Sequence, residues 1–305
     1  MARPIIIDTD PGIDDAVAIL LALASPELSV EALVAVAGNL PLAATAANAR
    51  GIVELAGCPE LPVYAGCPRP LGPTERRADS AHGEGGLGDL VLPPPDMPPR
   101  PEHGVFFLIE RLRRAAPASV TLCALGPLTN IATALVMAPE IAGAVSELVV
   151  MGGGTHGNMT PAAEFNMHAD PQAAAIVFAS KLPITLLPLD VTETALSTAA
   201  RIAPIGALTT RCGAAAAALL GPRRSLGRPP MAMHDPCVIA WLLSPGLFRG
   251  GEAHVAIETA SPLTAGMTVI DRRLRGGRSA NARVLQAVDA AGLYRLLAER
   301  LACLP

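Results

Sequence analysis

The sequence predicts an α/β fold with a doubly wound, mainly parallel sheet flanked by helices and an active site at the carboxyl ends of the strands. Short apolar runs alternate with apolar stretches of helical length along most of the chain. Polar residues and glycines gather where the short runs end, and open α/β sheets bind their ligands there. The 305 residues contain no internal repeat and no evident linker, so we expect a single domain over residues 1–305.

Strands and helices are expected to alternate through the first third of the chain. The expected elements are a strand at 5–7, a helix at 16–24, a strand at 29–37, a helix at 42–55 and a short strand at 61–64. The segment from 66 to 102 is rich in proline and glycine and has no periodicity. A connection of this length without regular structure predicts a lid or binding loop.

Regular alternation resumes after this segment. Asp170 and Pro171 are the N-cap and first residue of one expected helix. The later elements are expected as helices at 105–115, 128–137, 173–180 and 236–243, strands at 120–125, 148–151 and 184–189, a helical region at 195–232, short strands near residues 255 and 267, and an amphipathic helix at about 285–301.

Composition excludes several classes of function. The formal net charge is −4, with no basic stripe, so we expect no nucleic-acid partner. The apolar runs are shorter than the roughly 18 residues that cross a bilayer, so we expect no membrane segment. No signal peptide is evident, and the six cysteines lack metal-site spacing. We therefore expect a cytoplasmic protein.

Four carboxylates follow the first expected strand, at Asp8, Asp10, Asp14 and Asp15, around a turn at Pro11–Gly12. Carboxylates this close repel one another unless a cation or a raised pKa relieves them. A divalent metal site is therefore one interpretation. The other is that Asp14 and Asp15 cap the following helix, but capping gives no reason for Asp8 and Asp10.

Polar groups also follow the later strands, at Asn39, Leu125–Gly126, Met151–Gly152 and His234–Asp235. The carboxyl ends of parallel strands share one edge of a sheet, so these groups can converge. Asp10, Asp15 and Asp235 with a backbone carbonyl would suit a hard cation such as Ca²⁺. Such a cation would lower the pKa of a bound water, whose proton a neighbouring aspartate could take.

At this point the sequence resembles a known family. The octapeptide Asp-Thr-Asp-Pro-Gly-Ile-Asp-Asp at 8–15 resembles the signature of the inosine-uridine preferring nucleoside hydrolases. Further segments continue the resemblance in the family's order at 38–39, 125–130, 151–153, 164–166 and 234–236. The resemblance implies a calcium-dependent enzyme that hydrolyses the N-glycosidic bond of a small-molecule ribonucleoside, releasing nucleobase and ribose, and that forms a homodimer or homotetramer.

The resemblance also implies a role for each matching residue. Asp10, Asp15, Asp235 and the carbonyl of Leu125 would bind Ca²⁺, and Asp10 would also be the general base. His234 matches the histidine that would protonate a leaving purine, and Asp8 would support the loop from behind. The implied substrate contacts are Asp14, Asn39, Glu164 and Asn166 on the ribose, Met151 lining its pocket, and His82 and Asn158 near the base.

Simple chemistry agrees with these roles. The transition state should resemble an oxocarbenium ion, whose charge a carboxylate such as Glu164 would stabilise. A nucleobase is a poor leaving anion, so protonation by a histidine helps its departure. Structural interpretations stand beside them: Asp235 with Pro236 is an ordinary helix start, Met151 could be core packing, and His82 lies among glycines that could be simple turns.

Three alternatives remain open from the sequence. Family members often place aromatic residues before the His-Asp-Pro element, whereas residues 223–233 contain none, so a different riboside could be the substrate. Asp8 and Asp10 after an apolar strand also resemble an Asp-nucleophile phosphohydrolase, although the later motifs do not fit that class. A riboside-binding protein without turnover is the third alternative.

Overall fold

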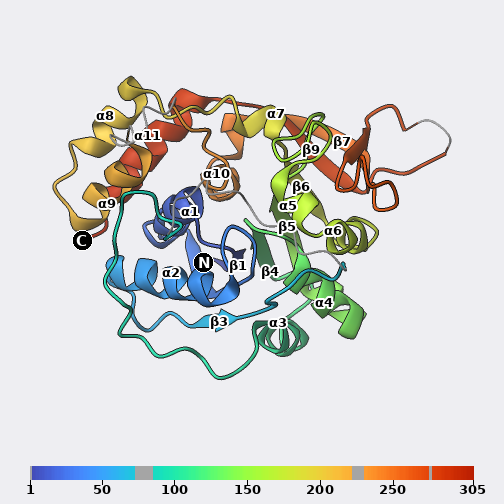
Figure 1. Ribbon diagram of the computed structural model, residues 1–305, viewed down its shortest axis with the longest axis horizontal. Helices are drawn as coiled ribbons and strands as arrows, with labels where there is room; N and C mark the ends of the chain where they lie inside the picture. The colour runs from blue at the N-terminus through green and yellow to red at the C-terminus, as the bar shows by residue number, and fades with distance from the viewer. Residues whose placement is uncertain (1, 73–84, 222–229, 275–276) are drawn as a thin grey trace.

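The computed structural model describes residues 2–72, 85–221, 230–274 and 277–305 (Figure 1). In these residues one sheet contains the strands β1 (Arg3–Thr9), β2 (Leu28–Ala35), β3 (Val63–Ala65), β4 (Val120–Ala124), β5 (Val145–Met151), β6 (Ile184–Leu187), β7 (Phe248–Ile257), β8 (Thr268–Asp271) and β9 (Ala282–Val288). Their spatial order is β3-β2-β1-β4-β5-β6-β9-β7-β8. The predicted α/β fold is confirmed.

The chain reverses its direction of winding in the middle of the sheet. It moves outward from β1 to β2 and β3, returns to β4 on the other side of β1, and continues to β5 and β6. These strands pair in parallel, as do β6 and β9, whereas β7 runs antiparallel to both β9 and β8. The carboxyl ends of β1 and β4 flank this switch point, where doubly wound sheets bind ligands.

Helices cover both faces of the sheet. One face packs against α1 (Ile13–Leu23), α2 (Leu42–Leu55), α8 (Ala199–Gly206), α9 (Arg211–Leu220), α10 (Pro236–Leu243) and α11 (Ala290–Leu301). The other packs against α3 (Gly104–Arg113), α4 (Thr129–Met137) and α6 (Pro171–Phe178). Two short helices, α5 (Phe165–Ala169) and α7 (Leu189–Thr192), follow β5 and β6. In Figure 1, α8, α9 and α11 lie together at one side of the molecule.

Alternation along the strands divides the core between these two faces. Ile5 and Ile7 pack under the α1 face, whereas Ile6 between them packs under the α4 face. Val149 and Val150 divide in the same way. Successive side chains of a strand point to opposite faces, so a sheet that is covered on both sides needs unbroken apolar strands.

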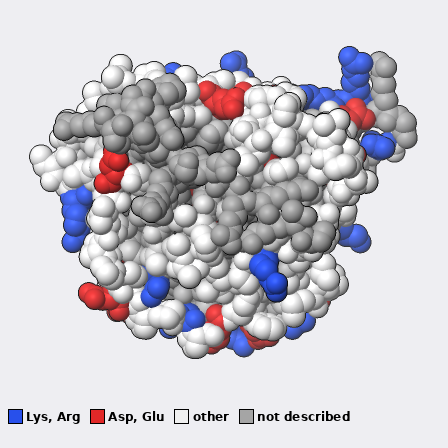
Figure 2. Space-filling model, in the orientation of Figure 1, with Lys and Arg blue, Asp and Glu red and all other residues white. Residues whose placement is uncertain are grey.

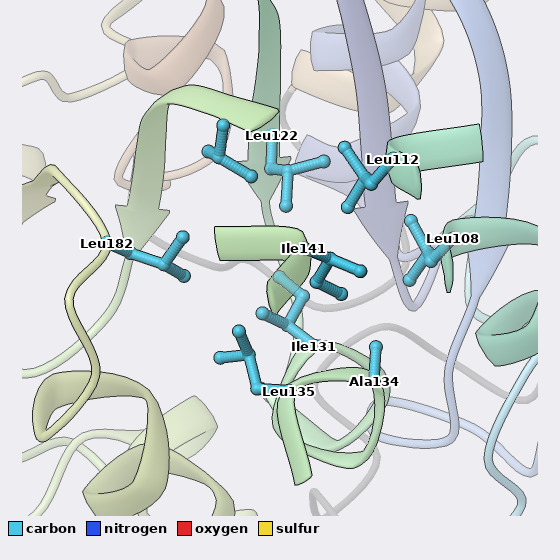
Figure 3. A pocket seen from close by; sticks show the side chains of 9 residues that line it. Leu108, Leu112, Leu122, Ile131, Ala134, Leu135, Ile141 and Leu182 are labelled. Carbon is cyan, nitrogen blue, oxygen red and sulfur yellow. The ribbon is translucent and has the colours of Figure 1, made fainter. Parts of the chain in front are cut away.

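The core under α3 and α4 is tightly packed. A cavity of about 10 Å³ remains there, lined only by aliphatic side chains (Figure 3). Leu108, Leu122 and Ile131 point into it from α3, β4 and α4. A dry apolar space of this size holds no ligand, so the cavity is a packing defect.

Most predicted elements are confirmed, with α2 reproduced residue for residue. Asp170 caps α6, accepting a hydrogen bond from the amide of Ala173 at 3.1 Å. In the segment 66–102, the described residues form turns and bends without helix or strand. None of the described helices is long and apolar enough to span a membrane.

The predicted helix at 285–301 was wrong in its first turn. Residues up to Val288 belong to β9, which inserts between β6 and β7. The helix begins only after Asp289, whose carboxylate accepts a hydrogen bond from the amide of Gly292 at 3.0 Å. A short apolar run is compatible with a strand as well as with a helix. Here pairing with two neighbouring strands outweighs the local helical periodicity. The predicted strand at 184–189 likewise ends early, at Leu187, because α7 follows.

Candidate active site

The acidic turn between β1 and α1 lies at the switch point of the sheet. Asp10 and Asp15 are each 1% exposed, and Asp14 is 7% exposed. Asp235, more than two hundred residues later, is 3% exposed at the start of α10, and α10 packs against α1. This packing brings the fourth carboxylate to the other three.

Asp15 organises the turn. One of its carboxylate oxygens accepts hydrogen bonds from the hydroxyl of Thr9 at 2.6 Å and the amide of Asp10 at 3.3 Å. The other accepts from the amide of Gly12 at 3.0 Å and from the side chain of Asn39 at 3.4 Å. The bond to Gly12 closes the amino end of α1, so Asp15 also performs the capping that the sequence suggested.

Two glycines leave the space that the Asp10 carboxylate occupies. A Cβ on Gly38 would lie 2.1 Å from Oδ2 of Asp10, and one on Gly126 would lie 2.4 Å from Oδ1. The amide of Asn39 donates to Oδ2 at 2.6 Å, and the Asn39 side-chain amide donates to the Asp10 carbonyl at 3.2 Å. The ends of β2 and β4 therefore hold Asp10 in place from two sides.

Carboxylate oxygens of Asp14, Asp15 and Asp235 lie within 4.8 Å of one another. The residues predicted Asp10, Asp15 and Asp235 as metal ligands, and the family resemblance implied a sugar contact for Asp14; the compact trio contains Asp14 with Asp15 and Asp235. Asp10 is nevertheless close enough for its charge to raise the pKa of Asp235. The turn and α10 thus build one buried cluster of four carboxylates.

The electrostatics of the cluster favour a bound cation. Burial, followed by the charge of Asp15, holds the pKa of Asp10 well above its ordinary value. Burial and the charges of Asp14 and Asp15 do the same for Asp235. In the described part of the chain no lysine or arginine is buried. All the candidate ligand atoms of the cluster are carboxylate oxygens. The site therefore fits a hard divalent cation and lacks the nitrogen and sulfur ligands that zinc prefers.

Glu164 lies at the start of α5, 2% exposed. Its carboxylate accepts hydrogen bonds from the amides of Gly153 at 2.8 Å, Asn166 at 2.9 Å and Met167 at 3.1 Å. Burial raises the pKa of Glu164 to about 7, although these three bonds oppose the rise. A Cβ on Gly152 would lie 3.1 Å from Oε2 of Glu164, so the glycine run after β5 makes room for this carboxylate.

Asn166 links the ends of two strands. Its side-chain amide donates to the carbonyl of Leu125 at 2.7 Å and to the carbonyl of Met151 at 3.2 Å. A carbonyl oxygen has two lone pairs, so that of Leu125 retains acceptor capacity for a cation. Met151 itself is 4% exposed and belongs to the core under α1.

Comparison with known proteins decides the family. The model of the inosine-uridine preferring nucleoside hydrolases matches residues 5–295. The chain belongs to this family. Pyrimidine-specific ribonucleoside hydrolase RihA of Shewanella sp. (strain ANA-3) is 43% identical over 309 residues, which cover 99% of this chain and 97% of the relative.

Solved structures agree with this assignment. A plant nucleoside hydrolase, the PpNRh1 enzyme, is 31% identical with a TM-score of 0.91 and matches over 99% of both chains. A purine-preferring ribonucleoside hydrolase from Gardnerella vaginalis is 30% identical with a TM-score of 0.88 and matches over 98% of both chains. Hydrolysis of N-glycosidic bonds is therefore the reaction class of this hydrolase.

The residues predicted near the base differ in their surroundings. Asn158 is exposed, and its Oδ1 accepts a hydrogen bond from the amide of Phe165 at 2.9 Å, which secures the start of α5. His234 is half-buried beside Asp235. His82 and most of the segment 223–233 lie outside the described residues.

Sequence reasoning missed the residues that hold the acids in place. Asn130 donates to Oδ2 of Asp8 at 2.8 Å and to the carbonyl of Ala35 at 3.2 Å, and it accepts from the amide of Cys67 at 2.7 Å. Asp8 lies behind the turn, where the family resemblance implied that it supports the loop. Burial raises the pKa of Asp8 to about 8. Thr9 and Thr192 also contact site residues. Asn130 stands within a family motif, but no sequence signal identifies Thr192.

Proposed function

We propose that this hydrolase uses Ca²⁺ to cleave pyrimidine ribonucleosides into ribose and the free base. The observation that carries the proposal is the buried, oxygen-only cluster of Asp10, Asp14, Asp15 and Asp235 at the switch point of the sheet. Such a cluster without a buried basic side chain in the described residues calls for a divalent cation. The pyrimidine preference rests on the RihA relative.

The cation would be held by Asp10, Asp15, Asp235 and the carbonyl of Leu125. When bound, it would lower the pKa of a water and hold sugar hydroxyls. Asp14 lies close enough to the other carboxylates to be a further ligand or, as the family resemblance implies, a sugar contact. Asp10 acts as the base that takes the proton of the attacking water, because two glycines and Asn39 keep its carboxylate in one orientation.

The ribose would lie at the carboxyl edge of the sheet, between the residues that follow β2 and those that follow β5. Asn39 and Asn166 use their side-chain N–H groups on the protein, which leaves each Oδ1 to accept from a sugar hydroxyl. Glu164, fixed by three backbone amides, supplies negative charge beside the developing oxocarbenium ion. As the glycosidic bond breaks, its electron pair goes to the base, which His234 protonates.

A substrate panel tests the proposal. Purified protein is assayed with Ca²⁺ against uridine, cytidine, inosine and nicotinamide riboside, and ribose and base are quantified. We expect kcat/KM for uridine or cytidine to exceed that for inosine by at least about tenfold. Preference for inosine would overturn the pyrimidine assignment, and no release from any riboside would overturn the activity. Phosphate release from a generic phosphoester would instead support the phosphohydrolase alternative.

A further inference from the structure

Residues 188–197, which include α7, connect the glycine loop beside Glu164 with the chain that leads into His234. At their beginning, the amide of Leu189 donates to the carbonyl of Gly153 at 2.9 Å. Asp190 then accepts hydrogen bonds from the hydroxyl and the amide of Thr155, the latter at 2.9 Å. This end of the segment is therefore attached to the glycine loop against which Glu164 is bonded.

The other end of the segment holds the chain that leads into His234. The amide of Ser197 donates to the carbonyl of Met231 at 2.8 Å, and the amide of Met233 donates to the carbonyl of Ala195 at 3.1 Å. These bonds form a short antiparallel bridge. The main chain immediately before His234 is thus fixed to the residues that follow α7.

Between these two attachments, Thr192 reaches the His234 ring. Thr192 is completely buried, and its hydroxyl oxygen lies 2.8 Å from Nδ1 of His234. The same hydroxyl lies 3.4 Å from the carbonyl of Pro188, one helical turn earlier. A hydroxyl can donate one hydrogen bond while accepting another, so Thr192 can donate to Pro188 and accept from His234.

We propose that Thr192 is a positioning residue for protonation of the leaving base, acting through His234; the inference rests on the proposed function. Thr192 accepts the Nδ1–H of His234, which directs Nε2 and its proton to the substrate. When the C–N bond breaks, its electron pair goes to the base nitrogen, and the proton moves from Nε2 to the base. The neutral ring keeps its Nδ1 proton, so the bond to Thr192 persists through the step.

The hydroxyl of Thr192 sets the orientation of the ring. Rotation about the Cβ–Cγ bond of histidine is broad, and without a partner at Nδ1 the ring could turn Nε2 away from the base. Valine has nearly the shape of threonine but cannot accept a hydrogen bond. The Thr192→Val variant therefore removes the contact to His234 while keeping the packing volume around α7.

A comparison of two leaving groups tests the proposal. Uridine needs protonation of its base, whereas p-nitrophenyl riboside releases an anion that is stable without it. In Thr192→Val we expect kcat for uridine to fall about 30-fold, within the range that general acids contribute, with KM changed less than about threefold. The rate with p-nitrophenyl riboside should stay within about threefold of wild type, and Thr192→Ser should restore uridine turnover.

Thr194→Val is the matched control. The Thr194 hydroxyl donates to the carbonyl of Val191 at 2.7 Å, two residues along the same segment, and the residue is exposed. This variant should retain wild-type rates with both substrates. Equal losses with both substrates in Thr192→Val, or no loss with uridine, would overturn the positioning role. Wild-type protein inactive on every riboside would instead overturn the proposed function, so the two failures are distinguishable.

Discussion

The two edges of the sheet carry carboxylates of the same kind in opposite environments. At the carboxyl edge, Asp10, Asp15 and Asp235 are at most 3% exposed. At the amino edge, the starts of β5, β6 and β9 line an open groove of about 560 Å³ that contains Glu147, Glu252 and Arg283 among its residues.

The difference lies in what compensates each charge. In the amino-edge groove Glu252 and Arg283 form an ion pair at 3.3 Å, with side chains 58% and 52% exposed. Glu147 accepts hydrogen bonds from Thr185 at 2.7 Å and from Nε1 of Trp241 at 2.9 Å. At the carboxyl edge the acids face other acids, and burial raises the pKa of Asp10 and Asp235. Buried charge without a counter-charge, rather than acidity itself, marks the functional edge.

Figure 2 shows where the lysine, arginine and acidic groups lie on one face of the molecule. The blue lysine and arginine groups lie around the rim, several of them close together at the upper right, and the described atoms of this face carry no continuous basic stripe across it.

Removal of the cation is expected to have the largest effect. Protein treated with a chelator should lose turnover, and Ca²⁺ should restore it. Ca²⁺ at about 100 times its Kd should stabilise the fold by about 2.7 kcal/mol and raise Tm by roughly 5 °C. In Asp235→Asn this shift should shrink, whereas in Glu252→Gln it should remain. Full activity in the chelated protein would remove the metal from the proposal.

Asp10→Asn should lower kcat by about 1,000-fold, because an amide cannot take the proton of the attacking water. The amide oxygen can still accept from Asn39, so we expect the fold to persist, as circular dichroism would check. Glu252→Gln provides the same chemical change at the amino edge and should leave kcat unaltered. Comparable rates in the two variants would reject Asp10 as the base.

Gly126→Ala should lower kcat/KM by about 100-fold, the scale of a catalytic group displaced by about 1 Å. Its methyl group would lie 2.4 Å from Oδ1 of Asp10 and force the carboxylate to move. Gly251→Ala in β7 is the control, since no heavy atom lies within 4 Å of the added Cβ. Initial-rate kinetics on both variants would test this, and wild-type kinetics for Gly126→Ala would show that the cradle does not position Asp10.

The smallest effect is expected from breaking the ion pair at the amino edge. Arg283→Gln should change the free energy of unfolding by less than about 1 kcal/mol, because water already solvates both side chains. Urea denaturation would measure this change. A loss of several kcal/mol would mean that this edge is electrostatically more like the carboxyl edge than its exposure indicates.

Most of the fold follows from local patterns. The apolar run at Ile5 to Ile7 forms the centre of β1, which extends over Arg3–Thr9, and the helix predicted at 42–55 forms with those bounds. β9 does not form as predicted, because its short apolar run is compatible with helix or strand and only its neighbours β6 and β7 decide between them. Asp289 could have marked the helix start, since it is the N-cap of α11.

The site divides in the same way. The sequence by itself determined that acids, glycines and asparagines follow the strands, because parallel strands bring such residues to one edge. The order of the motifs also predicted that Asp235 meets Asp10 and Asp15. Only the tertiary structure decided that Asp14 lies with Asp15 and Asp235, that Gly38 and Gly126 enclose Asp10, and that Thr192 meets His234. These contacts join residues far apart in the chain or depend on side-chain direction, and they are set by how α1, α7 and α10 pack, which no local pattern encodes.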